Sequence, residues 1–191
     1  MSILRDSTEE AVATLRSLAA LEDAVNRAAE MIRKSLLSGG KLLVCGNGGS
    51  AADGADFATE FTCRFKQDRR PYPAMNLSDA GSLLTAIGND YEFAEVFARQ
   101  VRAFGRAGDV LVVFTTSGNS PNILAALRKA GEMGLQSVAF LGRAGGAAAG
   151  LATVELIVPC ETTARIQEAH KFLLHVLCEM LEGDLARAGK D

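Results

Sequence analysis

Five short apolar runs alternate with longer stretches in which apolar residues recur every three or four positions. The runs lie near residues 41–45, 73–77, 109–115, 136–141 and 153–158. Helical spacing marks the stretches near 50–65, 80–88, 91–104 and 120–133, and a last one from about 163 to 188. Runs such as Val110–Phe114 are continuously apolar, which is typical of parallel strands covered on both faces. The pattern predicts an α/β protein, a three-layer sandwich around a central parallel sheet of five strands.

The N-terminal segment has a helical pattern of its own. Leucines, alanines and valines recur at helical spacing over residues 5–38, and Gly39-Gly40 ends the run. A break near Leu18–Glu22 predicts two helices, which we expect to form a helical hairpin. Ala11–Ala29 carries more apolar surface than a lone exposed hairpin should show. We therefore expect residues 1–38 to pack on the core and to contribute to an oligomer interface.

Composition narrows the class of protein. The 191 residues are 48% hydrophobic and 23% charged, which suits one globular domain over residues 1–191. A net charge of −3 argues against nucleic acid or a membrane surface as the main partner. The acidic N-terminus is not a signal peptide. Cys45, Cys63, Cys160 and Cys178 show no CxxC spacing, so we expect reduced, mostly buried thiols and a cytoplasmic protein.

Two glycine- and serine-rich loops follow predicted strands and lead into predicted helices. The first is contained in Lys41–Ser50, and glycines there let the backbone approach a ligand closely. The second is Thr115–Ser120, with Ser120 as the helix N-cap and Pro121 at the first helical position. Both loops lie at the carboxyl ends of strands, where parallel sheets bind ligands. Together they suggest a phosphorylated small molecule held between them.

Candidate acid, base and metal-binding groups lie on two predicted helices. Asp56 and Glu60 are four positions apart and project from one helix face. On the last helix Gln167 and His175 lie within roughly 80° of each other, whereas His170 is about 140° from His175. Two carboxylates, an amide and an imidazole can bind a divalent metal or supply a base and an acid. A solvated acidic face and structural histidines are the alternatives.

Four motifs together resemble one known family. Cys45-Gly-Asn-Gly-Gly-Ser-Ala-Ala-Asp53, Ala86-Ile-Gly-Asn-Asp90, Thr116-Ser-Gly-Asn-Ser120 and Ala164-Arg-Ile-Gln-Glu168 are similar to the phosphoheptose isomerases, which are sugar-isomerase (SIS) domain proteins with a flavodoxin-like sheet. The resemblance covers nearly the whole chain. It implies interconversion of sedoheptulose 7-phosphate and D-glycero-D-manno-heptose 7-phosphate, toward bacterial surface heptose such as that of lipopolysaccharide. It also implies a homotetramer with active sites between subunits, and in many members zinc.

The resemblance assigns roles position by position. Glu60 and His175 would be catalytic, and Arg64 would reach the phosphate bound by a neighbouring subunit. The residues that would bind substrate are Asn47, Gly48, Gly49, Ser50, Arg64, Asn89, Asp90, Thr115, Thr116, Ser117, Ser120 and Gln167. The metal ligands would be Asp56, Glu60, Gln167 and His175.

One position departs from the family pattern. Asp56 stands where the resemblance implies a histidine ligand for the metal. Aspartate ligates zinc but adds negative charge, which weakens the Lewis acidity of zinc or favours a harder ion such as Mg²⁺ or Mn²⁺. Loss of the metal and a different sugar are equally consistent with this change. The alternatives to the heptose reaction are a non-catalytic SIS-fold protein that binds a phosphosugar or a replication initiator, and an isomerase of another phosphosugar.

Overall fold

One parallel sheet of five strands forms the centre of the computed structural model, which describes residues 2–188. The strands are β1 (Leu42–Gly46), β2 (Ala74–Asn76), β3 (Val110–Thr115), β4 (Gln136–Gly142) and β5 (Val154–Val158). They are ordered β2-β1-β3-β4-β5, and every neighbouring pair is parallel. Each strand lies within about one residue or two of a predicted apolar run, so the predicted α/β class and five-stranded sheet are confirmed.

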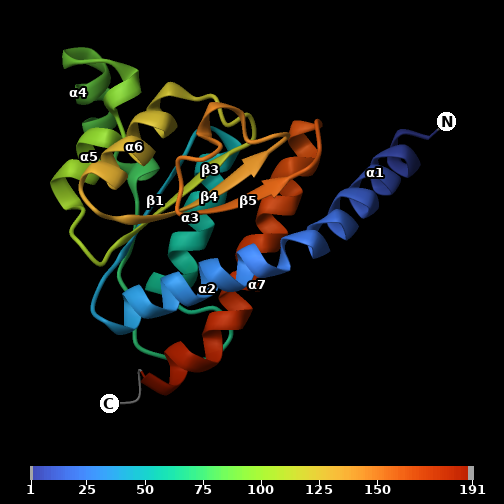
Figure 1. Ribbon diagram of the computed structural model, residues 1–191, viewed down its shortest axis with the longest axis horizontal. Coiled ribbons are helices and arrows are strands. Elements are labelled where there is room, and N and C mark those ends of the chain that lie inside the picture. The colour runs from blue at the N-terminus through green and yellow to red at the C-terminus, as the bar shows by residue number, and fades with distance from the viewer. Residues whose placement is uncertain (1, 189–191) are drawn as a thin grey trace.

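Helices cover both faces of the sheet (Figure 1). They are α1 (Ile3–Ser17), α2 (Glu22–Leu37), α3 (Gly49–Thr62), α4 (Ser82–Asp90), α5 (Ala98–Phe104), α6 (Pro121–Glu132) and α7 (Thr163–Ala188). Short 3₁₀ turns occupy Leu18–Leu21, Leu77–Asp79, Phe93–Glu95 and Gly146–Ala148. Residues of α2, α3 and α7 pack on one face, and residues of α4, α5 and α6 on the other. The result is the predicted three-layer arrangement.

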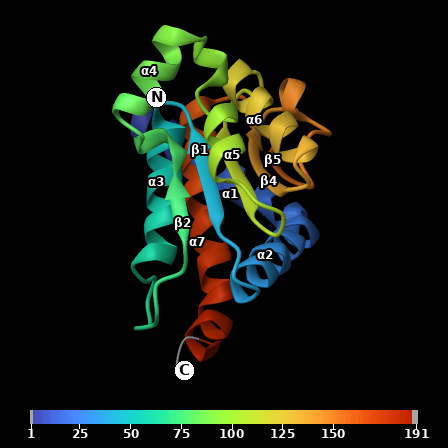
Figure 2. The ribbon, with the colours of Figure 1, turned by 90° about the vertical axis from the view of Figure 1, so that its left-hand side faces the viewer.

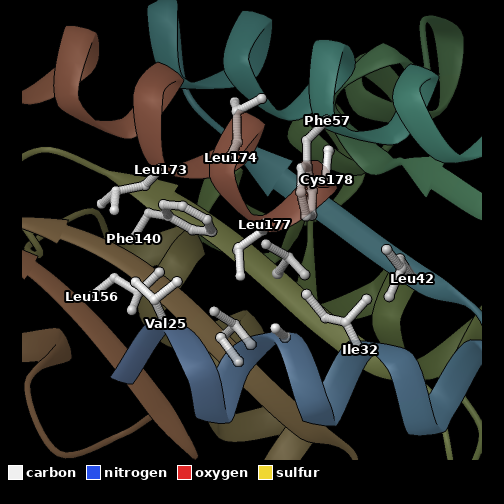
Figure 3. Packing of buried hydrophobic residues seen from close by; sticks show 14 of the residues in the cluster. Val25, Ile32, Leu42, Phe57, Phe140, Leu156, Leu173, Leu174, Leu177 and Cys178 are labelled. Carbon is white, nitrogen blue, oxygen red and sulfur yellow. The ribbon is translucent and has the colours of Figure 1, made fainter. Parts of the chain in front are cut away.

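The larger of the two cores holds α3 and α7 in place. Phe57 of α3 and Leu174, Leu177 and Cys178 of α7 meet above the sheet, and Ile32 of α2 closes the cluster (Figure 3). All five side chains are buried. Full burial of each large apolar side chain contributes about 1.5–3 kcal/mol. Because both helices are fixed by this packing, the polar side chains on their other faces have defined positions.

The loops after β1 and β3 lie next to each other because these two strands are neighbours in the sheet. Gly46 at the end of β1 is in register with Phe114 near the end of β3. The chain then proceeds to β2 on one side and to β4 on the other, so this edge is the topological switch point where open α/β sheets bind ligands. Both predicted phosphate loops therefore lie at the ligand-binding edge.

Two expectations about the helices are wrong. The expected N-terminal hairpin does not form. The 3₁₀ turn Leu18–Leu21 joins α1 to α2, and α1 extends outward from the start of α2 instead of lying back along it (Figure 1). The turn keeps right-handed dihedrals at Leu18, so it bends the chain without reversing it. The stretch 91–104, expected as one helix, begins only at Phe93 because Glu92 is extended, and a turn at residues 96–97 separates its two helical pieces. Only Phe93–Glu95 and α5 are helical there.

Two further features are the state of the four cysteine thiols and the length and hydrophobicity of the helices. All four cysteines are free, with Cys45 and Cys178 buried, Cys160 half-buried and Cys63 exposed. Burial raises the pKa of the Cys45 and Cys178 thiols, which keeps them protonated. Over residues 2–188, no helix is long and apolar enough to cross a membrane.

Candidate active site

A polar hollow of about 240 Å³ opens at the switch point between β1 and β3. Most of its lining residues come from the two loops and the first turns of the helices that follow, while Thr163 and Gln167 come from the start of α7. They are Asn47, Ser50, Phe114, Thr115, Thr116, Ser117, Ser120, Thr163 and Gln167. Hydroxyl and amide groups at helix N-termini are suited to an anion such as a phosphate.

The first loop depends on two of its glycines. Gly48 has φ = +55°, a conformation that glycine adopts at little cost. At Gly49 a Cβ atom would collide with the side-chain amide of Gln167, so a larger residue would push Gln167 out of its place beside the loop. The Ser50 N–H donates to the Asn47 carbonyl oxygen (3.0 Å) and closes the turn into α3. Of the predicted residues of this loop, Asn47 and Ser50 line the hollow, and Gly48 and Gly49 shape the turn beside it.

The second loop presents its hydroxyl groups in two different ways. Thr115 Oγ1 is buried and accepts a hydrogen bond from the Gly118 N–H (3.2 Å), so it shapes the loop. Ser120 occupies the N-cap position and Pro121 the first position of α6, as predicted. The Ser120 hydroxyl makes no capping hydrogen bond within the described residues, although such a bond is usual at this position. This hydroxyl remains available in the hollow.

Asn122 is a residue of this site that the sequence analysis missed. Its side-chain amide and that of Asn47 exchange two hydrogen bonds of 2.9 Å each. Asn122 is only 1% exposed and also accepts a hydrogen bond from the Ile123 N–H. The signal available in the sequence was an asparagine in the first turn of a helix that follows a ligand loop. The pair ties the two loops together and orients Asn47.

The second part of the site lies further along α3 and α7, which run side by side (Figure 2). Asp56, Glu60 and His175 each offer a ligand atom, and these atoms lie within 4.8 Å of one another. His175 Nε2 is 3.5 Å from Asp56 Oδ2, and the His175 ring stacks on Phe65. The residues predicted to act as acid, base or metal ligands are therefore brought together from two helices. Gln167 lies two turns before His175 and lines the polar hollow.

The surroundings of Glu60 raise its pKa above that of an ordinary glutamate. Partial burial raises the pKa of Glu60, and repulsion by Asp56 adds to this, while His175 opposes it. A carboxyl group with a raised pKa is a better match for proton transfer near neutral pH than an ordinary glutamate. Glu60 thus has the electrostatic setting expected of a general base.

Lys171 is the second residue that the sequence analysis missed. Its Nζ lies 2.8 Å from Asp56 Oδ2 and 3.2 Å from Asp53 Oδ1. Burial alone would lower the pKa of Lys171, but its hydrogen bonds to the two aspartates outweigh burial and raise it. The spacing of Gln167, Lys171 and His175, one helical turn apart, was the available signal.

The donor types of this cluster suit a divalent metal, but a neighbouring lysine competes for one of its oxygens. Two carboxylates and an imidazole can hold a divalent ion. However, the Asp56 oxygen that lies nearest His175 already accepts the ammonium of Lys171. A metal bound at this oxygen would have to share it with a second cation. The expected four-ligand site would therefore place the metal close to the ammonium of Lys171 if it used this oxygen.

Several expected site residues lie elsewhere. Arg64 is exposed after the end of α3 and donates to the Lys66 carbonyl oxygen (3.0 Å). Asn89 and Asp90 are exposed at the end of α4 and hydrogen-bond to each other. None of the three lines the polar hollow of the same chain. His170 is fully buried with its Nε2 3.1 Å from the Leu141 carbonyl oxygen, so it is a structural histidine.

The sequence model of the SIS domain matches residues 8–142 of this chain. The fold and the two-part site therefore define a SIS-domain protein.

Relatives narrow the class further. The phosphoheptose isomerase of Citrifermentans bemidjiense is 47% identical over 170 residues, which cover 89% of this chain and 88% of that protein. The solved structure of a phosphoheptose isomerase from Francisella tularensis superposes with a TM-score of 0.91 at 36% identity, covering 96% of this chain and 100% of that one. The phosphoheptose isomerase from Neisseria gonorrhoeae superposes with a TM-score of 0.88 at 42% identity, covering 94% and 97%. The chain belongs to the phosphoheptose isomerases, a family of sugar isomerase enzymes.

Proposed function

We propose that this protein converts sedoheptulose 7-phosphate to D-glycero-D-manno-heptose 7-phosphate in the cytoplasm, as a step toward bacterial surface heptose. The observation that carries the proposal is the position of the polar hollow and of the Glu60–His175 pair along the same two helices. The hollow and this pair form the two ends of a track along α3 and α7. The hollow suits a phosphate, and the pair offers an acid and a base.

The separation of the two ends suits a long phosphosugar. Gln167 at the hollow and His175 at the acid–base pair are eight residues apart on α7, which corresponds to about 12 Å. The six C–C bonds of a heptose, of about 1.5 Å each, give a chain of at most roughly 9 Å before the phosphate is added. A triose phosphate has only two such bonds and would not extend from the hollow to Glu60 and His175. The rise along the helix therefore favours a longer sugar phosphate over a triose phosphate.

Glu60 and His175 can perform the proton transfers of an aldose–ketose exchange. Starting from the ketose, the Glu60 carboxylate takes a proton from C1 while the C2 oxygen receives a proton from His175, which gives the enediol. Glu60 then returns its proton to C2, and His175 takes the O1 proton, which leaves the aldehyde at C1. Each group ends in its starting protonation state. Asn47, Thr116, Ser117 and Ser120 hold the phosphate end and thereby fix C1 and C2 beside Glu60.

The resemblance implies zinc in many members of the family. If Asp56, Glu60, Gln167 and His175 bound such a divalent ion, it would supply positive charge beside the enediolate. Because Lys171 already occupies an oxygen of Asp56, the proton transfers above are assigned to Glu60 and His175 alone.

We further propose a homotetramer in which subunits complete one another's sites. Arg64, Asn89 and Asp90 are exposed and lie outside the hollow of their own chain. In an oligomer they would reach the phosphate or the sugar hydroxyls bound by a neighbouring subunit.

The test of the proposed reaction is turnover of sedoheptulose 7-phosphate, followed by NMR of the sugar carbons. Glu60→Gln should lower kcat by about 10²–10⁴-fold, because the base is lost while the phosphate loops remain. Glu179→Gln is the control, since Glu179 is an exposed carboxylate of the same region that pairs with Lys66. No turnover by the wild-type protein, or full activity of Glu60→Gln, would contradict the proposal.

The ion pair between Asp56 and Lys171 favours a second candidate, a protein that binds a phosphosugar without converting it. A site that has exchanged a metal for a lysine could have kept binding and lost catalysis. Tight binding of sedoheptulose 7-phosphate without turnover, measured by calorimetry on the same preparation, would support this candidate.

A further inference from the structure

We propose that the ammonium of Lys171 is the resident cation of this active site and takes the place that a divalent metal would fill, so that isomerisation proceeds without bound metal. This inference rests on the proposed function.

The position of Lys171 carries the argument. On α7 it lies one turn after Gln167 and one turn before His175, and thus between the two residues of that helix expected to bind a metal. Across from it on α3, Asp56 Oδ2 accepts its hydrogen bond at 2.8 Å and lies 3.5 Å from His175 Nε2. The ammonium therefore occupies the Asp56 oxygen that faces His175, which is one of the oxygens a metal shared with His175 would use.

A buried aspartate provides a second, independent observation. The side chain of Asp53 is 9% exposed, and its Oδ1 lies 3.2 Å from Lys171 Nζ. Its other oxygen, Oδ2, is buried without a hydrogen-bond partner among residues 2–188. An anionic side chain this deep requires a counter-charge, and within residues 2–188 Lys171 is the cation that pairs with it. Two aspartates one turn apart thus hold the ammonium in place.

Electrostatic repulsion makes the lysine and a metal compete for this site. An ion bound to Asp56 Oδ2 at about 2.1 Å would lie no more than about 5 Å from the ammonium that shares this oxygen. The repulsion between a divalent and a monovalent cation at this distance lowers metal affinity at least about tenfold, even with the dielectric constant of water. Because Lys171 Nζ and His175 Nε2 lie 2.8 Å and 3.5 Å from the same Asp56 oxygen, the ammonium would place positive charge near an enediolate that forms beside His175.

The experiment measures metal binding and turnover separately. Wild-type protein is stripped with a chelator and checked by elemental analysis, and its zinc affinity is measured by competition with a chromophoric chelator. Lys171→Met removes the charge, and Lys171→Arg keeps it. Lys129→Met is the matched control, since Lys129 is a similarly exposed lysine that pairs with Glu132 on α6.

We expect metal-free wild type to be active and added zinc to change its rate less than twofold. Lys171→Met should bind zinc at least tenfold more tightly than wild type and lose metal-free turnover about 100-fold, with recovery on adding zinc. Lys171→Arg and Lys129→Met should keep weak zinc binding. Because Lys171→Met leaves Asp53 without a counter-charge, the double variant Asp53→Asn, Lys171→Met is measured alongside it, and the same gain in zinc affinity is expected.

The failures of the two proposals are distinguishable. Wild type that is inactive without metal and active with zinc would overturn the inference and leave the isomerase intact. If no preparation turns over the sugar, the proposed function fails, and with it metal-free isomerisation, but the zinc measurements still decide whether Lys171 takes the place of the metal. Equal zinc affinity of wild type and the folded variants that lack Lys171 would overturn it.

Discussion

The side-chain amides of Asn47 and Asn122 exchange two hydrogen bonds across the switch point of the sheet, although the residues are 75 positions apart in the sequence. This pair joins the loop after β1 to the first turn of α6. It gives the polar hollow a fixed width before any ligand arrives, which reduces the ordering cost of binding.

Asn122→Ala should therefore lower both stability and substrate affinity. The substitution removes both hydrogen bonds to the half-buried amide of Asn47, and two bonds of about 0.5–1.5 kcal/mol each correspond to about 1–3 kcal/mol of unfolding free energy. Chemical denaturation measures this cost, and a double-mutant cycle with Asn47→Ala isolates the pair. A coupling energy of about 1 kcal/mol or more is expected. Strictly additive effects of the two substitutions would show that the amide pair does not hold the loops together.

Ser120→Ala should separate binding from stability. The Ser120 hydroxyl makes no capping bond among the described residues, so its loss should change the free energy of unfolding by less than about 0.5 kcal/mol. A hydrogen bond to a charged phosphate is worth about 1.5–3 kcal/mol, so KM should rise about 10- to 150-fold while kcat changes little.

Steady-state kinetics and thermal unfolding of the same Ser120→Ala preparation test this pair of effects. A loss of stability with unchanged KM would assign Ser120 to the helix start instead of to the ligand.

The buried His170 should make stability depend on pH. Burial lowers its pKa to about 4, from an ordinary value near 6.5. Between these values the unfolded chain binds more protons than the folded one, so this contribution is complete above pH 6.5 and is lost as pH falls toward 4. The shift corresponds to about 3 kcal/mol at most.

The matched variant for this prediction is His170→Gln, which retains an amide donor near the Leu141 carbonyl oxygen. The difference in unfolding free energy between wild type and variant should rise with pH from 4 to 6.5 and then level off. Groups such as Asp53 and Glu60 titrate in both proteins and cancel in the difference. A difference that does not vary over this range would contradict the assigned burial of His170.

The sequence predicts the sheet well because its strands are locally encoded. A continuously apolar run such as Val110–Phe114, bounded by a glycine-rich loop, has few alternatives to a buried parallel strand. The pairing of Asp56 with Glu60 was equally readable, since four positions on a helix bring two side chains to one face.

Relationships that depend on packing between distant segments were not readable in this way. Lys171 on a helix surface would ordinarily be solvated, and only the packing of α7 on α3 places it against Asp53 and Asp56. The direction of α1 likewise depends on the backbone dihedrals of a four-residue turn, Leu18–Leu21, that the hydrophobic pattern does not specify.

The outer surface of α1, α2 and α7 leads to the last prediction, which concerns the oligomer. A groove of about 670 Å³ runs between these helices, and its lining includes Leu15, Leu18, Phe172, Val176 and Met180. Phe172 is 48% exposed, and α1 extends away from the sheet (Figure 1). An apolar groove beside an unsupported helix suits a second copy of the chain.

Phe172→Asp should therefore shift the protein from a tetramer to smaller species in light scattering at micromolar concentration. Turnover should fall as well, because Arg64, Asn89 and Asp90 would no longer reach a neighbouring site. Arg128→Asp is the control, because Arg128 is an exposed residue of α6, which packs on the opposite face of the sheet. A wild-type protein that is already monomeric at this concentration would contradict the prediction.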